Sequence, residues 1–566
     1  MIKPKQVWHG VWQDLLPYDG RWAQAWRIAF LCMLTTGVAM TYGIPEACIS
    51  CYVLFFVMKS DAVESALMAV ALLVLVSIMV FVLIGLIQLS IDSPPMRLIL
   101  LVLSSLLFMF LGVSSMVGPV GGILALVIAF VLTMLAYIPV GELATRAVLY
   151  AWLMTAMPMG LLLIASLLIG RNPRTVLLHE MATRLELAAE LLEQHVGSLE
   201  KTRANLLSGI EEQQKRVQWV SLLHLAPKFW QPWYAHAVVH SYGVLLAAYQ
   251  WQQQGAKATT ESLQLARVCR QAATQLRLKQ RPSELELPEG LALEPLQQAL
   301  QQQLNALMVS TPTTTLPKEK SRFFVEDAFT NPAYFRLAIQ TTLAGVLCYL
   351  IYSAADWQGI HTALITCYIV GLSSTGETLH KMILRISGCL VGVLITFIYW
   401  FVFIPHMTSI GALMLAVFMV CLLAAWVVLG SERISYAGLQ IAFAFLLINL
   451  SHMGPAVDMD MAWDRIMGIL LGNLMMYVFF TYLWPYSIMH FIRQQMKQVK
   501  AALLQRDQAS NLTEATVYAA TAAKALELAE YELELAPLEP KTIRATAEQL
   551  QQQRLELEQA QQRLLS

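Results

Sequence analysis

The chain has 566 residues, of which 57% are hydrophobic and 13% charged, and its mean hydropathy is +0.56. A soluble globular protein carries about 25% charged residues, so this composition excludes an ordinary soluble protein and indicates a membrane protein. Lysine plus arginine and aspartate plus glutamate number 38 each, so the net charge gives no basis for a nucleic-acid partner.

The first 25 residues are polar and aromatic, without the short apolar core and small-residue cleavage site of a secretory signal. The first spanning helix is therefore expected to be retained, with 1–25 as a cytoplasmic N-terminus. A spanning helix needs about 20 apolar residues. Residues 26–170 are predicted to form a first transmembrane block from six apolar runs, at 26–43, 45–58, 66–91, 97–113, 117–139 and 143–170.

The remaining chain repeats this plan. Residues 171–333 are polar, and apolar side chains recur every three or four positions in 176–199, which predicts a helical cytoplasmic domain. Residues 487–566 are predicted to form a helical cytoplasmic tail. A second six-helix transmembrane block is predicted over 334–486, with runs at 334–353, 359–372, 380–404, 408–429, 435–451 and 463–486. The predicted fold class is an all-α polytopic membrane protein.

Metal and redox chemistry find little support in the sequence. Seven of the eight cysteines lie in apolar segments, as small buried hydrophobic residues do. Cys48 and Cys51 form a CxxC without a second pair, and His236 and His240 share a helical face without a third ligand. No metal site and no cofactor are predicted. The segment 229–251, which holds both histidines, is nearly long enough to span, but its polar residues favour a buried core helix.

Short matches in the same order indicate that the two blocks are copies. The first opens with WRIA at 26–29 and the second with FRLA at 335–338, and ISCYV at 49–53 corresponds to ITCYI at 365–369. Their similar offsets favour duplication over chance.

Basic residues flank the outer ends of both blocks, before the first and after the sixth helix of each. Since short basic flanks stay in the cytoplasm, both termini and both polar regions are expected there. Arg97 and Arg146 fall on the disfavoured side.

An arginine followed by glycines three and seven residues later occurs twice, in 385-RISGCLVG-392 and 465-RIMGILLG-472. On a helix these positions share one face. Small residues four apart let membrane helices approach closely, whereas an arginine at bilayer depth costs about 2.5 to 3.5 kcal/mol on insertion scales. The arginines either reach the interface or pair with a carboxylate such as Asp464 or Glu377, or they attract an anion. We predict that Gly388, Gly392, Gly468 and Gly472 pack helices.

The segments before these motifs also correspond, at offsets of 78 to 80, in 357-WQGIHTAL-364 and 436-YAGLQIAF-443. The second block is thus expected to contain two three-helix units of opposite orientation, a common plan of secondary transporters. This would place Arg385 toward the cytoplasmic side and Arg465 toward the other, as two cationic positions on one path. Further arginines stand in comparable places, and the predicted substrate-binding set is Arg385, Arg465, Arg27, Arg336 and Arg146.

No nucleotide-binding or catalytic motif supports an enzyme. The stretch 371-GLSSTGET-378 has P-loop glycine spacing, but Glu377 stands where the lysine should be. Uphill transport would need an ion gradient or a separate motor. Asp61, Glu377 and Asp464 are candidate proton-coupling groups.

The stretches 464-DRIMGILLGNL-474, 483-LWP-485 and 376-GETLHKMILRISGCLVG-392, together with the six, soluble, six, soluble plan, resemble the fusaric acid resistance and aromatic acid exporter family of bacterial inner-membrane proteins. The resemblance implies efflux of small organic anions, such as aromatic carboxylic acids or related drugs. It also implies a tripartite pump with a periplasmic membrane-fusion adaptor and an outer-membrane channel. A passive anion channel and a membrane-anchored helical scaffold are the alternatives.

Overall fold

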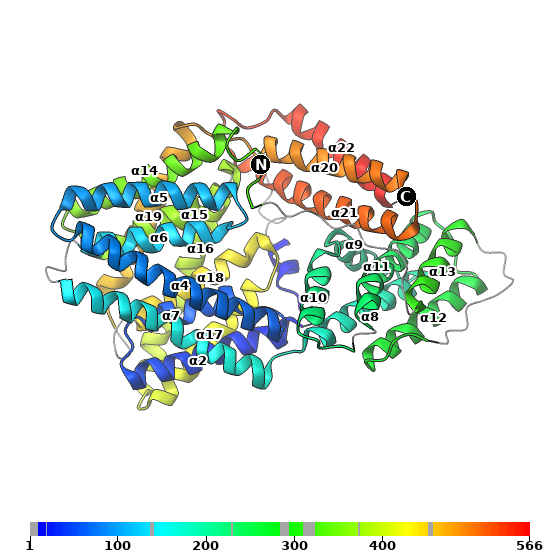
Figure 1. The fold of residues 1–566 in the computed structure, drawn as a ribbon, viewed down its shortest axis with the longest axis horizontal. Coiled ribbons are helices and arrows are strands. Elements are labelled where there is room, and N and C mark those ends of the chain that lie inside the picture. The colour runs from blue at the N-terminus through cyan, green and yellow to red at the C-terminus, as the bar shows by residue number, and fades with distance from the viewer. Residues whose placement is uncertain are drawn as a thin grey trace. The chain divides into compact units, whose positions relative to one another are not determined.

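The computed structural model describes residues 10–18, 20–135, 141–227, 230–283, 294–309, 323–325, 327–371, 374–450 and 457–565. Throughout these ranges the secondary structure is helical, with a single isolated β-bridge and no strand (Figure 1). Within them, nine helices are long and apolar enough to cross a membrane, and three shorter apolar helices accompany them. The predicted all-α polytopic membrane fold is confirmed. The end of the predicted run 117–139 lies outside the described residues.

Twelve apolar helices account for the predicted runs. The helices of the first block are α2 (Arg21–Tyr42), α3 (Ala47–Val57), α4 (Ala62–Ser90), α5 (Pro94–Ser114), α6 (Pro119–Met134) and α7 (Gly141–Ile169). Those of the second are α14 (Pro332–Ala354), α15 (Thr362–Val370), α16 (Thr375–Ile398), α17 (Ile410–Val428), α18 (Glu432–Leu450) and α19 (Met459–Tyr482). A π-helical turn, Tyr399–Phe403, extends α16, and α3 and α15 are too short to span alone.

Helices of each block pack against helices of the other block in a reciprocal pattern. Helices α2 and α3, the first two of the first block, pack against α17 and α18, the fourth and fifth of the second. Conversely, α14 and α15 pack against α5 and α6. A buried hydrogen bond of 2.6 Å between Ser105 Oγ and Tyr368 Oη joins α5 to α15. This reciprocal pairing supports the predicted duplication, and both blocks belong to one compact unit, the membrane unit (Met1–Gly170, Ser321–Tyr486 and Leu538–Ile543).

The second compact unit, the polar unit, combines Arg171–Lys320 with Ser487–Pro537 and Arg544–Ser566. Its helices are α8 (Pro173–Leu192), α9 (Leu199–Leu207), α10 (Glu211–Leu222), α11 (Gln231–Gln253), α12 (Thr260–Arg277), α13 (Pro295–Met308), α20 (Met489–Gln508), α21 (Leu512–Leu535) and α22 (Ala547–Leu565). Helix α11 contacts α8, α13 and α21 and buries large side chains such as Trp233 and Tyr242, so the segment that could have been mistaken for a span is a core helix.

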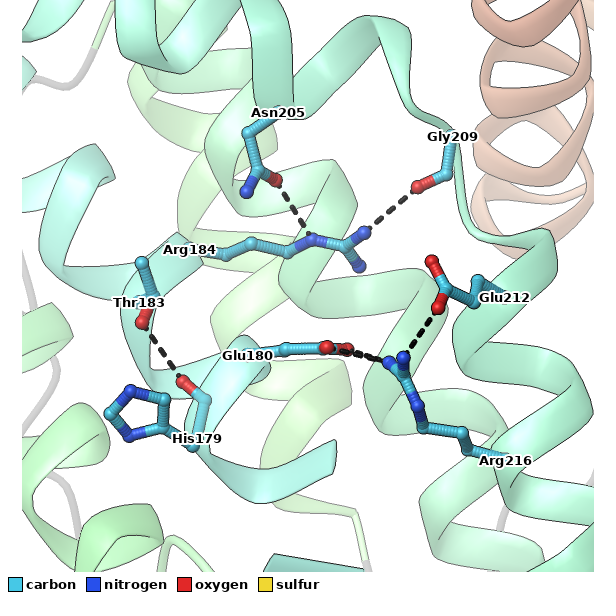
Figure 2. Close-up of polar contacts among 8 residues, drawn as sticks. All are labelled: His179, Glu180, Thr183, Arg184, Asn205, Gly209, Glu212 and Arg216. Carbon is cyan, nitrogen blue, oxygen red and sulfur yellow. Dashed lines mark hydrogen bonds and ion pairs between the residues drawn. The ribbon is translucent and has the colours of Figure 1, made fainter. Parts of the chain in front are cut away.

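Two buried arginines are held by polar groups in the core of the polar unit (Figure 2). Arg184 donates to Asn205 Oδ1 at 3.1 Å and to the Gly209 carbonyl at 2.8 Å. Arg216 forms ion pairs of 2.5 Å with Glu180 and with Glu212. Burial raises the pKa of Glu180, and the charge of Arg216 opposes that rise. Every buried guanidinium here therefore contacts an acceptor, as burial of charge requires.

Candidate functional site

The glycines of the first arginine motif lie where α16 meets α18. A Cβ atom on Gly388 would come within 2.5 Å of the Ala437 carbonyl oxygen, and one on Gly392 within 2.7 Å of the Ala444 Cβ and 2.8 Å of the Ile441 oxygen. Real Cβ atoms do not approach backbone this closely, so the two helices meet at a distance that only glycine permits.

The second motif makes the equivalent contact on another pair of helices, α19 and α15. A Cβ on Gly472 would lie 2.6 Å from both the Ala363 oxygen and the Thr366 Cβ, and one on Gly468 would collide with Thr362. Gly472 therefore lies against a backbone oxygen and a Cβ atom, as Gly392 does. The third and sixth helices of the block each use their motif glycines to pack closely, against the fifth and second helices respectively.

Close packing of these helices buries Arg385 completely. Its Nε donates to Thr366 Oγ1 at 3.1 Å on α15, and its Nη1 donates to Tyr436 Oη at 2.9 Å on α18. Its Nη2 has no hydrogen-bonding partner among the described residues. Arg385 is therefore fixed in place by two neutral oxygens, with its charge uncompensated by any carboxylate in the described chain.

Arg465 is also buried, with a relative exposure of 1%, but it forms fewer hydrogen bonds than Arg385 does. Its guanidinium carbon lies 4.1 Å from the centre of the Phe443 ring, a cation–π arrangement. None of its three side-chain nitrogens has an oxygen or nitrogen acceptor in the described ranges, and the polar group beside it is the Cys389 thiol. The neighbouring Asp464 instead accepts a 2.7 Å hydrogen bond from Trp357 Nε1. Pairing of Arg465 with Asp464, one of the sequence-based alternatives, is therefore absent from the described structure.

The two arginines belong to one buried cluster. Their charges act on each other, and both act on Tyr52 of α3 and on Cys389 of α16. The sequence places Arg385 and Arg465 toward opposite sides of the membrane, whereas the structure brings both side chains to the same group of neighbours. The cationic positions therefore form a single site of two charges.

Two further residues of this cluster escaped the sequence analysis. The ring of Tyr52, from the first block, stacks on Phe443 with centroids 4.3 Å apart. The Gln440 amide lies within reach of the Tyr52 hydroxyl, and neither group forms a hydrogen bond of good geometry in the described chain. Gln440 could have been found from the sequence, because it is an uncharged polar residue inside an apolar run. Tyr52 could not, because tyrosine is common in membrane proteins.

The other predicted arginines lie elsewhere in the membrane unit. Arg27 lines a small pocket of about 10 Å³ together with Lys59 and Asp61. Arg336 is exposed. Arg146 is exposed and pairs with Glu142 at 2.6 Å within α7. Of the five predicted arginines, the structure therefore brings only Arg385 and Arg465 into one cluster.

Each of the three predicted proton-coupling carboxylates lies at a position where it can stabilise the local structure. Asp61 caps α4 by accepting from the Glu64 backbone N–H at 2.8 Å. Asp464 accepts from Trp357, as described above, and Glu377 lies in the first turn of α16. Negative charge in the first turn of a helix is favourable. Their role in proton coupling stays a prediction.

Comparison with known proteins finds a family match over the segment that holds both arginines. Residues 347–479 match the family described as fusaric acid resistance protein-like. The chain carries a fusaric acid resistance-like segment, as its motifs predicted. That segment contains Arg385, Arg465 and all four motif glycines.

Curated relatives extend the similarity over most of the chain. The multidrug resistance protein MdtO of Escherichia coli K12 is 28% identical over 498 residues, which cover 84% of this chain and 71% of that protein. MdtO of Escherichia coli O157:H7 is 29% identical over 496 residues, with the same coverage. MdtO of Shigella flexneri is 28% identical over 498 residues. No solved structure matches the chain significantly.

Proposed function

We propose that this protein is an inner-membrane efflux transporter of small organic anions, and that Arg385 and Arg465 bind the anionic group of the substrate. The observation that carries the proposal is the burial of two interacting cations with no carboxylate partner in the described chain. A buried charge is normally paired, because burial without a partner costs several kcal/mol or more. An anionic ligand that binds between the two guanidinium groups would supply the missing charge.

The neighbours of the arginines suit a substrate with an aromatic body and a second polar group. Phe443 and Tyr52 offer ring surfaces beside Arg465. Gln440 can both donate and accept, and its amide forms no hydrogen bond of good geometry in the described structure. Aromatic carboxylic acids meet both requirements. The relatives named as multidrug resistance proteins support efflux as the direction of transport.

The wider setting is part of the same proposal. Both termini and the polar unit would be cytoplasmic, and the transporter would work with a periplasmic adaptor and an outer-membrane channel. Because Tyr52 belongs to the first block and both arginines to the second, movement between the blocks would open or close the site.

Efflux measurements test the proposal. Cells carrying Arg465→Gln or Arg385→Gln should export hydroxylated benzoates at less than about a tenth of the wild-type rate, since each loses a charged contact worth about 1.5 to 3 kcal/mol. Arg336→Gln, which removes an exposed cation from the same unit, is the matched control and should export normally.

Wild-type export by both buried variants, at equal amounts of inserted protein, would contradict the anion site. Anion conductance in liposomes that requires no coupling-ion gradient would favour the passive channel. Loss of function on deleting 175–320, with dispensable arginines, would favour the scaffold.

A further inference from the structure

A groove of about 370 Å³ lies in the membrane unit where α5 begins and where α6 and α14 end. Its walls include Arg97, Leu98 and Leu101 of α5, Leu132 of α6, and Tyr349 and Leu350 of α14. Ligand pockets in proteins typically measure about 300 to 1,000 Å³, so the groove has room for part of a small molecule or a lipid. None of these residues belongs to the arginine cluster.

Among the described residues that line this groove Arg97 alone is charged, and it is buried, with a relative exposure of 9%. Its Nη2 donates a 3.3 Å hydrogen bond to the Ile91 carbonyl. Its Nε is buried without a partner in the described chain. A buried guanidinium in an otherwise apolar groove is short of one negative group.

The order of the lining residues along the helices indicates what kind of anion would fit. Arg97 lies in the first turn of α5, Leu101 about one turn deeper, and Tyr349 near the end of α14. Helix ends with tyrosine and arginine mark the headgroup level of a bilayer, and leucines beyond them lie at acyl-chain level. The N-terminus of α5, capped by Ser93, adds a partial positive charge beside Arg97.

We propose that this groove binds an acidic phospholipid, with its phosphate on Arg97 and an acyl chain along Leu98, Leu101 and Leu132. The leucine walls are the reason to choose a lipid over a free phosphate ion. Since α5 and α6 belong to the first block and α14 to the second, the bound lipid would hold the two blocks together. The proposal also gives a role to an arginine that the positive-inside rule leaves unexplained.

Lipid titration of the purified full chain in detergent tests this site. Dioleoyl phosphatidylglycerol should bind to the wild type and raise its unfolding temperature. Dioleoylglycerol, which lacks the phosphate, and inorganic phosphate, which lacks the chains, should give no comparable shift. Arg97→Gln should weaken phosphatidylglycerol binding about ten- to a hundredfold. Arg146→Gln, at an exposed and ion-paired arginine, is the control and should bind as the wild type does.

A second variant keeps the test decisive if Arg97→Gln folds poorly. Leu350 is 45% exposed and lines the groove, so Leu350→Trp should fill the space and reduce lipid binding while leaving Arg97 in place. Equal phosphatidylglycerol affinity in the wild type and both variants would overturn the proposal. A shift produced equally well by inorganic phosphate, or by dioleoylglycerol, would also overturn it.

Discussion

At the scale of single residues, Arg385 and Arg465 share a motif but differ in how they are held. Arg385 donates two hydrogen bonds to hydroxyl groups, whereas Arg465 has only the weakly accepting Cys389 thiol beside it in the described chain. Replacing a buried unpaired charge with an apolar side chain of similar size is often neutral or stabilising. Removing a bonded arginine instead leaves its former acceptors unsatisfied. Replacing Arg385 and replacing Arg465 should therefore change the stability of the protein differently.

We expect Arg465→Met to unfold at the same temperature as the wild type or higher, while losing anion efflux. Arg385→Met should be less stable by about 1 to 3 kcal/mol, because Thr366 and Tyr436 lose their donor. Thermal unfolding in detergent measures both variants, with Arg336→Met as the exposed control. A lower unfolding temperature for Arg465→Met would show that Arg465 is mainly a structural residue.

His240 gives the polar unit a predictable response to acid. Its Nδ1 lies 2.7 Å from Gln303 Oε1, and the Gln303 amide nitrogen donates to Thr516 Oγ1 at 2.9 Å. Burial lowers the pKa of His240 below 6.5; the hydrogen bond to Gln303 opposes this shift, and the nearby His236 adds to it. The unfolded chain therefore takes up a proton at a higher pH than the folded unit does, so folding is favoured above pH 6.5 and progressively less so below it.

Between pH 7.5 and 5.5 the unfolding temperature of the polar unit should fall, because its free energy of unfolding decreases by up to about 1.4 kcal/mol per pH unit below pH 6.5. His240→Gln removes this titration and should flatten the slope. Calorimetry of the full chain at several pH values, compared with His195→Gln at an exposed histidine, measures the effect. An unchanged slope in His240→Gln would contradict the assignment.

At the scale of helices, the glycine spacing could be predicted from the sequence, but the partners of the glycines could not. Positions i, i+3 and i+7 define a face of α16 from local geometry alone. Which helix covers that face depends on the tertiary fold, and α16 packs on α18 while α19 packs on α15. For the same reason the convergence of Arg385 and Arg465, and the approach of Tyr52 from the other block, had no signal in local sequence.

Gly388 and Gly472 should respond alike to substitution because each lies against a backbone oxygen of the neighbouring helix. Gly388→Ala and Gly472→Ala each place a Cβ 2.5 to 2.6 Å from a backbone oxygen, so we expect a loss of about 1 to 3 kcal/mol in each. Gly160, in α7, has no atom within 4 Å of a built Cβ. Gly160→Ala is therefore the matched control and should be neutral or slightly stabilising. Wild-type unfolding temperatures in both motif variants would exclude tight packing at these crossings.

At the scale of the whole molecule, the polar unit is assembled from two distant parts of the chain. The sequence predicts a helical insert and a helical tail, and the structure joins them into one compact unit. Amphipathic periodicity shows that a helix has a buried face but not which segment covers it. Here α21 of the tail contacts α9 and α11 of the insert, and the Gln303–Thr516 hydrogen bond and an Arg203–Glu530 ion pair of 3.0 Å cross between the parts.

Removing the tail should therefore unfold the insert. A chain that ends at Tyr486 leaves the apolar faces of α9 and α11 uncovered, and we expect limited proteolysis to cut within 171–320 much faster than in the full chain. Thr516→Val is the milder test: it leaves the buried Gln303 amide without its acceptor and should destabilise the polar unit by about 1 to 3 kcal/mol. Glu530→Gln disrupts only the half-exposed ion pair and should cost less than about 1 kcal/mol. Protease resistance of 171–320 that survives loss of the tail would show that the insert folds alone.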